Sequence, residues 1–269
     1  MMEIVPPKVM GVLNITPDSF SDGGFYFEPE KAIDRAASLI GQGADILDIG
    51  GESTRPGAAA VSLEEELSRV IPAIKAIRSR FDVDISIDTS KAAVMTDAVN
   101  AGATMINDVY ALRNEGALSA AAETTVPICL MHMQGTPETM QDAPQYKNLF
   151  DEINAFFRER IAACEIAGID KERLILDPGI GFGKTHQQNV QLLANLEQLK
   201  WLGPQLLVGV SRKSVIGNIV GKPVEERMIG SVVAGILAAW QGASILRVHD
   251  VKETVDALAV CNALMAERR

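Results

Sequence analysis

Eight short apolar runs follow one another along the chain, and each stops abruptly at polar residues. A run of four to eight apolar residues is typical of a buried strand, and the polar residue at its end is carried to one edge of the sheet. We therefore expect eight strands, one ending at Asn14 and the others at residues 45–51, 85–90, 105–108, 128–132, 174–179, 206–211 and 245–250.

Segments with helical spacing of apolar residues alternate with these strands, at residues 29–42, 62–80, 91–100, 116–123, 146–167, 187–200, 224–241 and 251–267. Strand and helix in strict alternation indicate parallel strands joined by helical crossovers. Several helices are followed directly by a glycine, which favours a left-handed cap: Gly43, Gly102, Gly168 and Gly242. Eight such units predict an α/β fold, a single (β/α)8 TIM barrel.

A doubly wound open sheet is the alternative architecture. It could also hold eight strands, but it gathers its ligand-binding residues at one topological switch point. Here polar residues end every strand, and this even distribution favours a closed barrel. A chain of 269 residues fits one such barrel, and no Pro-rich or Ser-rich linker divides it, so we expect one domain over residues 1–269.

Composition excludes several classes of partner. The formal net charge of -10 argues against nucleic acid and against an anionic membrane surface. The cysteines at 129, 164 and 261 are too scattered for a metal motif or a disulfide framework, and no signal peptide is evident, so we expect the cytoplasm. Residues 228–246 carry no charge, but Gln241 and Gly242 divide them into a last helix and a last strand rather than a membrane span.

In a closed parallel barrel the carboxyl ends of all strands meet at one rim, so the polar residues that end them should surround one pocket. These residues are Asn14, Asp48, Asp88, Asn107, His132, Asp177, Lys213, Arg247 and His249. Acids and amides from the third, fourth and sixth strands suit a neutral heterocycle with donors and acceptors, such as a purine or a pterin. A carboxylate such as Asp177 can accept two N–H bonds from a guanidine-like edge.

Basic residues gather late in the chain, in the stretch 211–214 (SRKS) and at Arg247 and His249. Side chains two apart on a strand point to the same side, so Arg247 and His249 can face one anion. A helix that starts near Ser214 would add free N–H groups, and loops after the seventh and eighth strands often hold phosphate in this fold. We expect a small phosphorylated or carboxylated substrate.

Two loops rich in Gly, Ser, Asp and Pro, at 16–24 and 50–57, are typical of rim segments that order around a ligand, and Phe182 in the loop 179–185 can stack on a flat ring.

Structural roles stay open for other residues. Asp48 and Asp108 are candidate caps or turn formers. His132 is either a ligand or a satisfied rim histidine, His186 is expected on the surface, and Met131 and Met133 are expected in packing, with Met131 able to form the floor of the pocket.

Seven motifs together resemble the bacterial dihydropteroate synthase family: residues 14–24 (NITPDSFSDGG), 50–57 (GGESTRPG), 87–90 (IDTS), 106–108 (IND), 177–184 (DPGIGFGK), 211–214 (SRKS) and 247–250 (RVHD). The resemblance implies a homodimeric TIM barrel of folate synthesis. It also implies condensation of 6-hydroxymethyl-7,8-dihydropterin diphosphate with 4-aminobenzoate, with Mg2+ as cofactor, release of diphosphate, and competition by sulfonamides.

The resemblance also implies roles for individual residues. Asn14 would contact Mg2+ and diphosphate, and the diphosphate would also contact Arg55, Arg247 and His249. The pterin pocket would hold Asp88, Asn107, Met131, Asp177 and Lys213. The 4-aminobenzoate site would use Phe20, Thr54, Arg55, Pro56, Phe182 and Ser214. The residues closest to the chemistry would be Asn14, Asp22, Lys213, Arg247 and His249.

Two other classes remain open. A pterin-binding methyltransferase of the methyltetrahydrofolate-corrinoid type would use a similar barrel, but it holds no diphosphate, so the basic residues count against it. A pterin-binding protein without activity would keep the pocket but would not need two rim loops. Turnover with diphosphate release separates the three.

Overall fold

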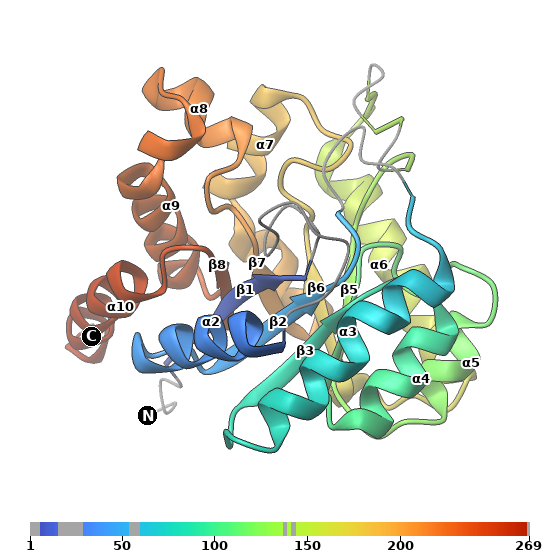
Figure 1. The fold of residues 1–269 in the computed structure, drawn as a ribbon. Coiled ribbons are helices and arrows are strands. Elements are labelled where there is room, and N and C mark those ends of the chain that lie inside the picture. Colours follow the sequence, from blue (N-terminus) through green and yellow to red (C-terminus); the bar gives the residue numbers. More distant parts are fainter. Residues whose placement is uncertain (1–5, 16–28, 54–59, 137–138, 141–143, 268–269) are drawn as a thin grey trace.

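Eight parallel strands close into a barrel in chain order, as the sequence predicts (Figure 1). The structure is a computed structural model that describes residues 6–15, 29–53, 60–136, 139–140 and 144–267. The strands are β1 (Lys8–Asn14), β2 (Ile46–Gly50), β3 (Asp84–Asp88), β4 (Met105–Asp108), β5 (Ile128–Met131), β6 (Leu174–Asp177), β7 (Gln205–Val208) and β8 (Ile245–Val248). The TIM barrel is confirmed.

Helices surround the barrel and connect its strands (Figure 1). The α-helices are α2 (Pro29–Gly41), α3 (Leu63–Arg78), α4 (Ala92–Ala101), α5 (Ala117–Ala122), α6 (Leu149–Ile166), α7 (His186–Ala194), α8 (Ser214–Val220), α9 (Met228–Trp240) and α10 (Val251–Ala266). Three short 3-10 helices join them: η1 (Lys171–Arg173), η2 (Leu196–Leu202) and η3 (Val224–Glu226).

Two expected helices differ from the structure. Residues 187–200 are not one helix, because α7 ends at Ala194 and Asn195 leaves helical geometry at φ -138° before η2 begins. The range 224–241 begins as η3, and α9 starts only at Met228. Arg227 lies between them and turns its guanidinium back to the carbonyl oxygens of Lys222 and Arg212.

The alternation of side chains along each strand produces two apolar layers. One side of each strand packs against the helices, with residues such as Leu47, Ile85 and Phe157 fully buried there. The other side fills the barrel interior with a separate cluster of Met10, Ile46, Met105, Cys129, Ile175, Leu207 and Ile245. The interior is therefore packed, and it leaves only the rim for polar chemistry.

The strand register aligns the polar residues at the rim. Asn14 pairs with Gly50, Gly50 with Asp88, and Asp88 with Asn107. On the other side of the barrel Met131 pairs with Asp177. One level of the barrel thus carries Asn14, Asp88 and Asn107 on adjoining strands.

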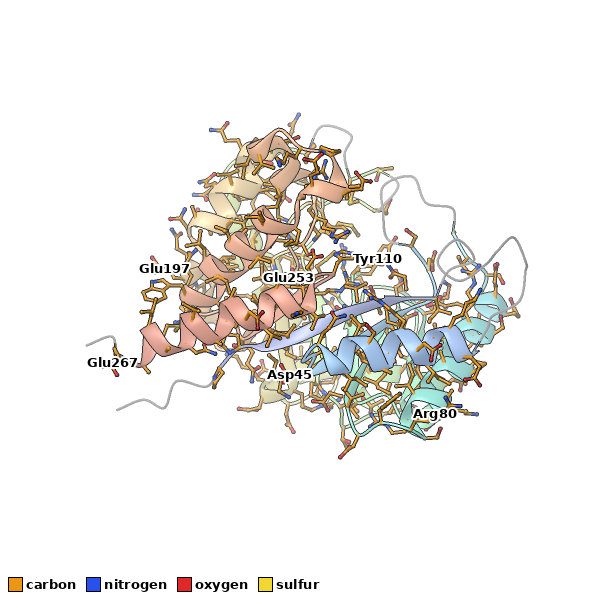
Figure 2. The ribbon with its side chains drawn as sticks, turned by 60° about the vertical axis from the view of Figure 1, so that its left-hand side comes forward. Asp45, Arg80, Tyr110, Glu197, Glu253 and Glu267 are labelled. Atoms are coloured by element: carbon orange, nitrogen blue, oxygen red, sulfur yellow. The ribbon has the colours of Figure 1, made fainter. Side chains whose placement is uncertain are left out.

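Close packing against β1 fixes where the barrel closes. Gly11 lies where an added Cβ atom would be 3.2 Å from Val251 of α10 and 3.5 Å from Leu39 of α2. Figure 2 shows these two helices with β1 running between them. Asp45, at the end of the α2 turn, accepts a hydrogen bond from the backbone N–H of Val9 at 2.7 Å. The helices and one carboxylate therefore set the position of the first strand.

The structure confirms the expected glycine caps after four helices and the division of the uncharged residues 228–246 into a helix and a strand. Gly43, Gly102, Gly168 and Gly242 all have positive φ, and the Gly102 N–H donates to the last carbonyls of α4. Residues 228–246 form α9, a turn at Gly242 and the start of β8. Among the residues that the structure describes, no helix is long and apolar enough to cross a membrane.

Candidate active site at the rim of the barrel

An arginine bridges two carboxylates at the mouth of the barrel. Arg247 of β8 donates from Nε to Asp48 Oδ2 at 2.6 Å and from Nη2 to Asp88 Oδ2 at 2.8 Å. The Asn107 amide nitrogen lies 3.4 Å from both oxygens of Asp48. The expectation that Asp48 is a cap or turn former is wrong, because its side chain points into the mouth and pairs with the guanidinium.

Asp177 and Lys213 lie on the opposite side of the mouth, together with Phe182. Asp177 is buried and accepts a hydrogen bond from the Gly179 N–H at 2.8 Å. Lys213 donates to the Ile180 carbonyl at 2.5 Å, and its ammonium lies 4.6 Å from the centre of the Phe182 ring. The segments after β6 and β7 therefore bring together an aromatic ring, a carboxylate and an ammonium group.

The loop after β6 packs directly on the segment after β5, and glycines make this possible. Gly179 has φ +66°, and a Cβ atom there would be 1.9 Å from the His132 carbonyl oxygen. At Gly183, with φ +60°, a Cβ atom would be 2.4 Å from the Gln134 carbonyl oxygen. Any side chain at these two positions would push the loop, and Phe182 with it, away from the barrel.

The buried side chain of Lys184 forms hydrogen bonds to backbone carbonyls of the same loop. Its buried ammonium lies 2.9 Å from His132 Nδ1 and 3.0 Å from the carbonyl oxygens of Gly179 and Phe182. Three N–H donors thus meet three acceptors. His132 is buried, and its ring also packs against Phe156, so it is a satisfied histidine rather than a free ligand. His186 is exposed at the start of α7, as expected.

Methionines form an apolar patch beside Asp177. Met131 is buried with Val109, Met133 and Met140, and Phe182 packs against this cluster. Because Met131 is the register partner of Asp177, a thioether side chain lies next to the carboxylate. An apolar surface beside paired polar groups is suited to one flat, polar-edged ring.

The basic residues of the last two strands have separate partners. His249 Nδ1 lies 3.0 Å from Ser211 Oγ, whereas Arg247 faces the two carboxylates. Arg212 forms a two-point ion pair with Asp250 at 3.0 and 2.5 Å and so points away from the mouth. Ser214 begins α8 and is exposed, as the sequence predicts. The structure thus pairs Arg247 with Asp48 and Asp88, and His249 with Ser211.

Comparison with known proteins places this geometry in a family. Residues 10–249 match the pterin binding enzyme family. The chain is 54% identical to the dihydropteroate synthase of Escherichia coli K12 over 267 residues, 99% of this chain and 95% of that protein. The chain belongs to the dihydropteroate synthase family.

Solved structures of the family superpose closely. The Yersinia pestis dihydropteroate synthase with a sulfonamide drug has a TM-score of 0.93 and 52% identity, covering 98% of this chain and 96% of that one. The Xanthomonas albilineans dihydropteroate synthase in complex with 7,8-dihydropteroate has a TM-score of 0.89 and 50% identity, covering 99% and 97%. The resemblance carried by the seven motifs is confirmed.

The mouth of this dihydropteroate synthase family member shifts the pKa values of its ionisable groups. Burial raises the pKa of Asp88, the charge of Asp48 raises it further, and Arg247 opposes both. Burial also raises the pKa of Asp177, against the effect of Lys213. Burial lowers the pKa of Lys213 to about 8, although Asp177 favours its charged form. Such shifts are typical of functional sites.

Asp108 shows what a structural aspartate does in the same region. Its carboxylate accepts the N–H groups of Tyr110 at 2.8 Å and Leu112 at 2.7 Å, within a turn in which Ala111 and Leu112 have positive φ. Its expected role as a turn former is confirmed. Asp48 lies in the middle of β2 and Asp108 is the last residue of β4, so the two carboxylates differ in position as well as in partner.

Several residues named from the sequence lie outside the described residues: Phe20, Asp22, Thr54, Arg55 and Pro56. The structure describes the residues on either side of these two gaps, at 15 and 29 and at 53 and 60. Asn14 ends β1, and both its Oδ1 atom and the Asp88 side chain lie within 4 Å of the place a Cβ atom of Gly50 would take. Among the described residues no group of three His, Cys, Asp or Glu side chains could hold a metal ion.

Lys184, which sequence reasoning did not single out, generates a pH prediction. Burial lowers the pKa of Lys184 to about 7 from an ordinary value of 10.5. Below pH 7 the buried lysine is charged in the folded state, and this lowers the free energy of unfolding. The loss becomes smaller as the pH rises above 7 and the folded protein releases the proton. We expect the stability of the wild type relative to Lys184→Met to increase from pH 7 to 9 by at most about 1.4 kcal/mol per unit.

Urea unfolding at several pH values checks this prediction. The matched control is Lys8→Met, which removes an exposed lysine paired with Asp84 at the other end of the barrel. A constant difference in unfolding free energy between wild type and Lys184→Met across the whole range would contradict the assignment.

Proposed function

We propose that this chain catalyses the reaction of its family, joining 6-hydroxymethyl-7,8-dihydropterin diphosphate to 4-aminobenzoate and releasing diphosphate. The observation that carries the proposal is the polar mouth, in which buried Asp88, Asn107 and Asp177 face the barrel axis beside an arginine and a lysine. Its relatives are named for this synthesis.

The pterin ring would bind in the mouth itself. Asp177 and Asp88 offer carboxylate oxygens to ring N–H groups, and the Asn107 amide offers both a donor and an acceptor. Lys213 supplies a donor for a ring oxygen or nitrogen, and Met131 supplies the apolar floor. This arrangement suits a ring with a donor edge and an acceptor edge better than it suits an anion, since three carboxylates line it.

The diphosphate would lie toward Asn14 and His249, with Arg55 from the second rim loop. Arg247 faces the same space while held by Asp48 and Asp88. Mg2+ prefers oxygen ligands and takes few from protein when phosphate oxygens complete its shell, so the amide oxygen of Asn14 fits this role. When bound, the ion would neutralise negative charge on the leaving diphosphate.

The 4-aminobenzoate would bind above the pterin, between Phe182, Ser214 and the rim loops that contain Phe20, Asp22, Thr54 and Pro56. Lys184 binds the backbone carbonyl of Phe182, and exposed Ser214 follows Lys213, whose ammonium lies over the Phe182 ring. A sulfonamide would take the same place. The Yersinia pestis relative with a sulfonamide drug supports this assignment.

The chemistry follows from these positions. The bond between the exocyclic methylene carbon of the pterin and the diphosphate oxygen breaks, and its electron pair leaves with diphosphate. Arg247 and His249 stabilise the developing negative charge. The electron-rich dihydropterin carries the positive charge until the amine of 4-aminobenzoate forms the new C–N bond and loses a proton. No protein nucleophile is required.

One assay tests the proposal. Purified protein is given the pterin diphosphate ester and Mg2+, with and without 4-aminobenzoate, and diphosphate and 7,8-dihydropteroate are measured. We expect both products only with the amine and less of both with a sulfonamide. Methyl transfer from methyltetrahydrofolate, or pterin binding without turnover, would instead support the methyltransferase or the inactive binding protein.

A second prediction concerns the pterin pocket. Asp177→Asn replaces a carboxylate acceptor with an amide, and loss of one charged hydrogen bond costs about 1.5–3 kcal/mol, or roughly 10- to 150-fold in affinity. Calorimetry with the pterin alcohol measures it. Asp84→Asn is the matched control, because Asp84 begins β3 at the opposite end of the barrel and pairs with exposed Lys8. If Asp177→Asn and Asp84→Asn bind the pterin alcohol with equal affinity, Asp177 does not belong to the pterin pocket.

The state of the cysteines agrees with a reducing compartment such as the cytoplasm. All three, Cys129, Cys164 and Cys261, are free and buried. Unpaired buried thiols are usual where disulfides do not form. We therefore propose the cytoplasm as the location of this chain.

We also propose a homodimer that pairs through α9 and α10. Ile229, Val233 and Leu237 are four residues apart on α9 and are 72%, 52% and 57% exposed. Val260 and Leu264 continue the exposed apolar surface on α10, which packs beside α9 (Figure 1). A stripe of large apolar side chains on neighbouring helices is typical of a subunit interface.

A third prediction tests the dimer. Light scattering on wild type should give about twice the chain mass of 28.9 kDa. Leu237→Glu places a charge in the centre of the stripe and should shift the protein to the monomer. Ile166→Glu, at an 89% exposed position at the end of α6, is the matched control and should stay dimeric. A monomeric wild type, or a dimeric Leu237→Glu, would contradict the interface.

A further inference from the structure

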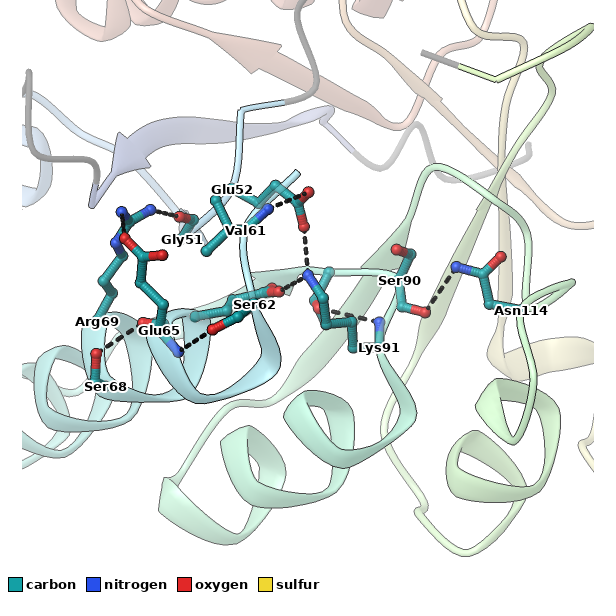
Figure 3. A network of polar contacts seen from close by, with 12 residues as sticks. Gly51, Glu52, Val61, Ser62, Glu65, Ser68, Arg69, Ser90, Lys91 and Asn114 are labelled. Atoms are coloured by element: carbon teal, nitrogen blue, oxygen red, sulfur yellow. Dashed lines mark hydrogen bonds and ion pairs between the residues drawn. The ribbon is translucent and has the colours of Figure 1, made fainter. Parts of the chain in front are cut away.

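A half-buried lysine, Lys91, joins the second rim loop to two helices. Lys91 Nζ lies 2.5 Å from Glu52 Oε2 and 2.5 Å from Glu66 Oε2 (Figure 3). Glu52 follows β2 at the start of the loop, Glu66 lies in the first turns of α3, and Lys91 precedes α4. One ammonium therefore connects three elements that are distant in sequence.

Both ends of the loop are held at this network. Glu52 accepts the backbone N–H of Val61 at 3.1 Å through its other oxygen, so the carboxylate spans from the beginning of the loop to its end. Arg69 of α3 donates to the Gly51 carbonyl at 2.6 Å. A Cβ atom at Gly51 would be 2.8 Å from Val70, so the loop begins in direct contact with α3.

The network also reaches the pterin-binding strand. Lys91 stands three residues after Asp88, and its own N–H donates to Thr89 Oγ1 at 3.3 Å. Asn114, beyond β4, donates to the Ser90 carbonyl at 3.2 Å and holds the same turn (Figure 3). The position of Lys91 is therefore coupled to β3, and the position of the loop is coupled to Lys91.

The charge arrangement argues against a purely stabilising ion pair. The Glu66 side chain is 1% exposed, and its Oε1 atom has no hydrogen-bond partner among the described residues. Burial alone would lower the pKa of Lys91, but the hydrogen bonds that it donates to Glu52 and Glu66 outweigh this effect and raise the pKa, so the ammonium is kept. Apolar replacements of buried ion pairs are often equally stable, so an incompletely satisfied pair indicates a positional role.

We propose that Lys91 is a positioning residue for the 4-aminobenzoate site: by pairing with Glu52 and Glu66 it fixes both ends of the loop that carries Thr54, Arg55 and Pro56. The inference rests on the proposed function. Lys91 does not contact the reacting atoms. It sets where the loop begins and ends relative to the pterin strand, and it therefore affects the second substrate rather than the first.

Steady-state kinetics of Lys91→Met test this. We expect the KM for 4-aminobenzoate to rise by about tenfold or more, a loss of about 1.4 kcal/mol in binding, while the KM for the pterin diphosphate stays within about twofold. Lys91→Arg keeps the charge and should recover most of the affinity. Lys8→Met, which removes an exposed lysine at the other end of the barrel, should behave as wild type.

A second variant keeps the test decisive if Lys91→Met does not fold. Glu52→Gln retains the shape and the acceptor for Val61 but weakens the pair with Lys91, and it should show the same one-sided rise in KM. Equal rises for both substrates, or no change in a stable variant, would overturn the positioning role alone. Wild type that releases no diphosphate would overturn the proposed function, and this inference with it.

Discussion

The bridge from Arg247 to Asp48 and Asp88 is the interaction on which the site depends. It links β8 to β2 and β3 across the mouth, passing β1, at the point where the barrel closes. The two carboxylates are buried above a largely apolar interior layer, where an unpaired charge would be costly. The guanidinium offsets the charge of these buried acidic groups, which can therefore face a ligand.

Backbone contacts position the other half of the site. Gly179 and Gly183 let the loop after β6 lie on the segment after β5, and Lys184 binds the carbonyls of that loop from within. Phe182 and Asp177 thereby take fixed places beside Lys213. The same principle acts at the second rim loop, where Gly51 touches α3 and Lys91 holds Glu52. The loop after β6 and the start of the second rim loop are thus each positioned by a lysine and by a glycine without room for a side chain.

The sequence predicts the barrel and most of the rim because both follow from local patterns. Apolar runs that end at Asn14, Asp88, Asn107 and Asp177 mark strand ends, and parallel closure brings strand ends together. It did not predict which partner each charge takes. Asp48 in the middle of β2 pairs with Arg247 across the barrel, whereas Asp108 at the end of β4 closes a local turn.

The sequence did not indicate the roles of Lys184 and Lys91, because their partners lie far away along the chain. The contact of Lys184 with His132 spans 52 positions, and that of Lys91 with Glu52 spans 39. Neither residue belongs to a charge pattern that local spacing would reveal. The break between α7 and η2 has a related origin, because Gln241 at the end of α9 accepts the N–H of Leu196 and so caps η2 from another helix.

A double-mutant cycle on Asp48 and Arg247 tests the central claim most directly. Urea unfolding gives the free energies of wild type, Asp48→Asn, Arg247→Met and the double variant. Because both single changes remove the same ion pair, we predict that the double variant is more stable than the sum of the two losses implies, by at least about 1.5 kcal/mol. Losses that add to within about 0.5 kcal/mol would show that the two side chains act independently and would contradict the account.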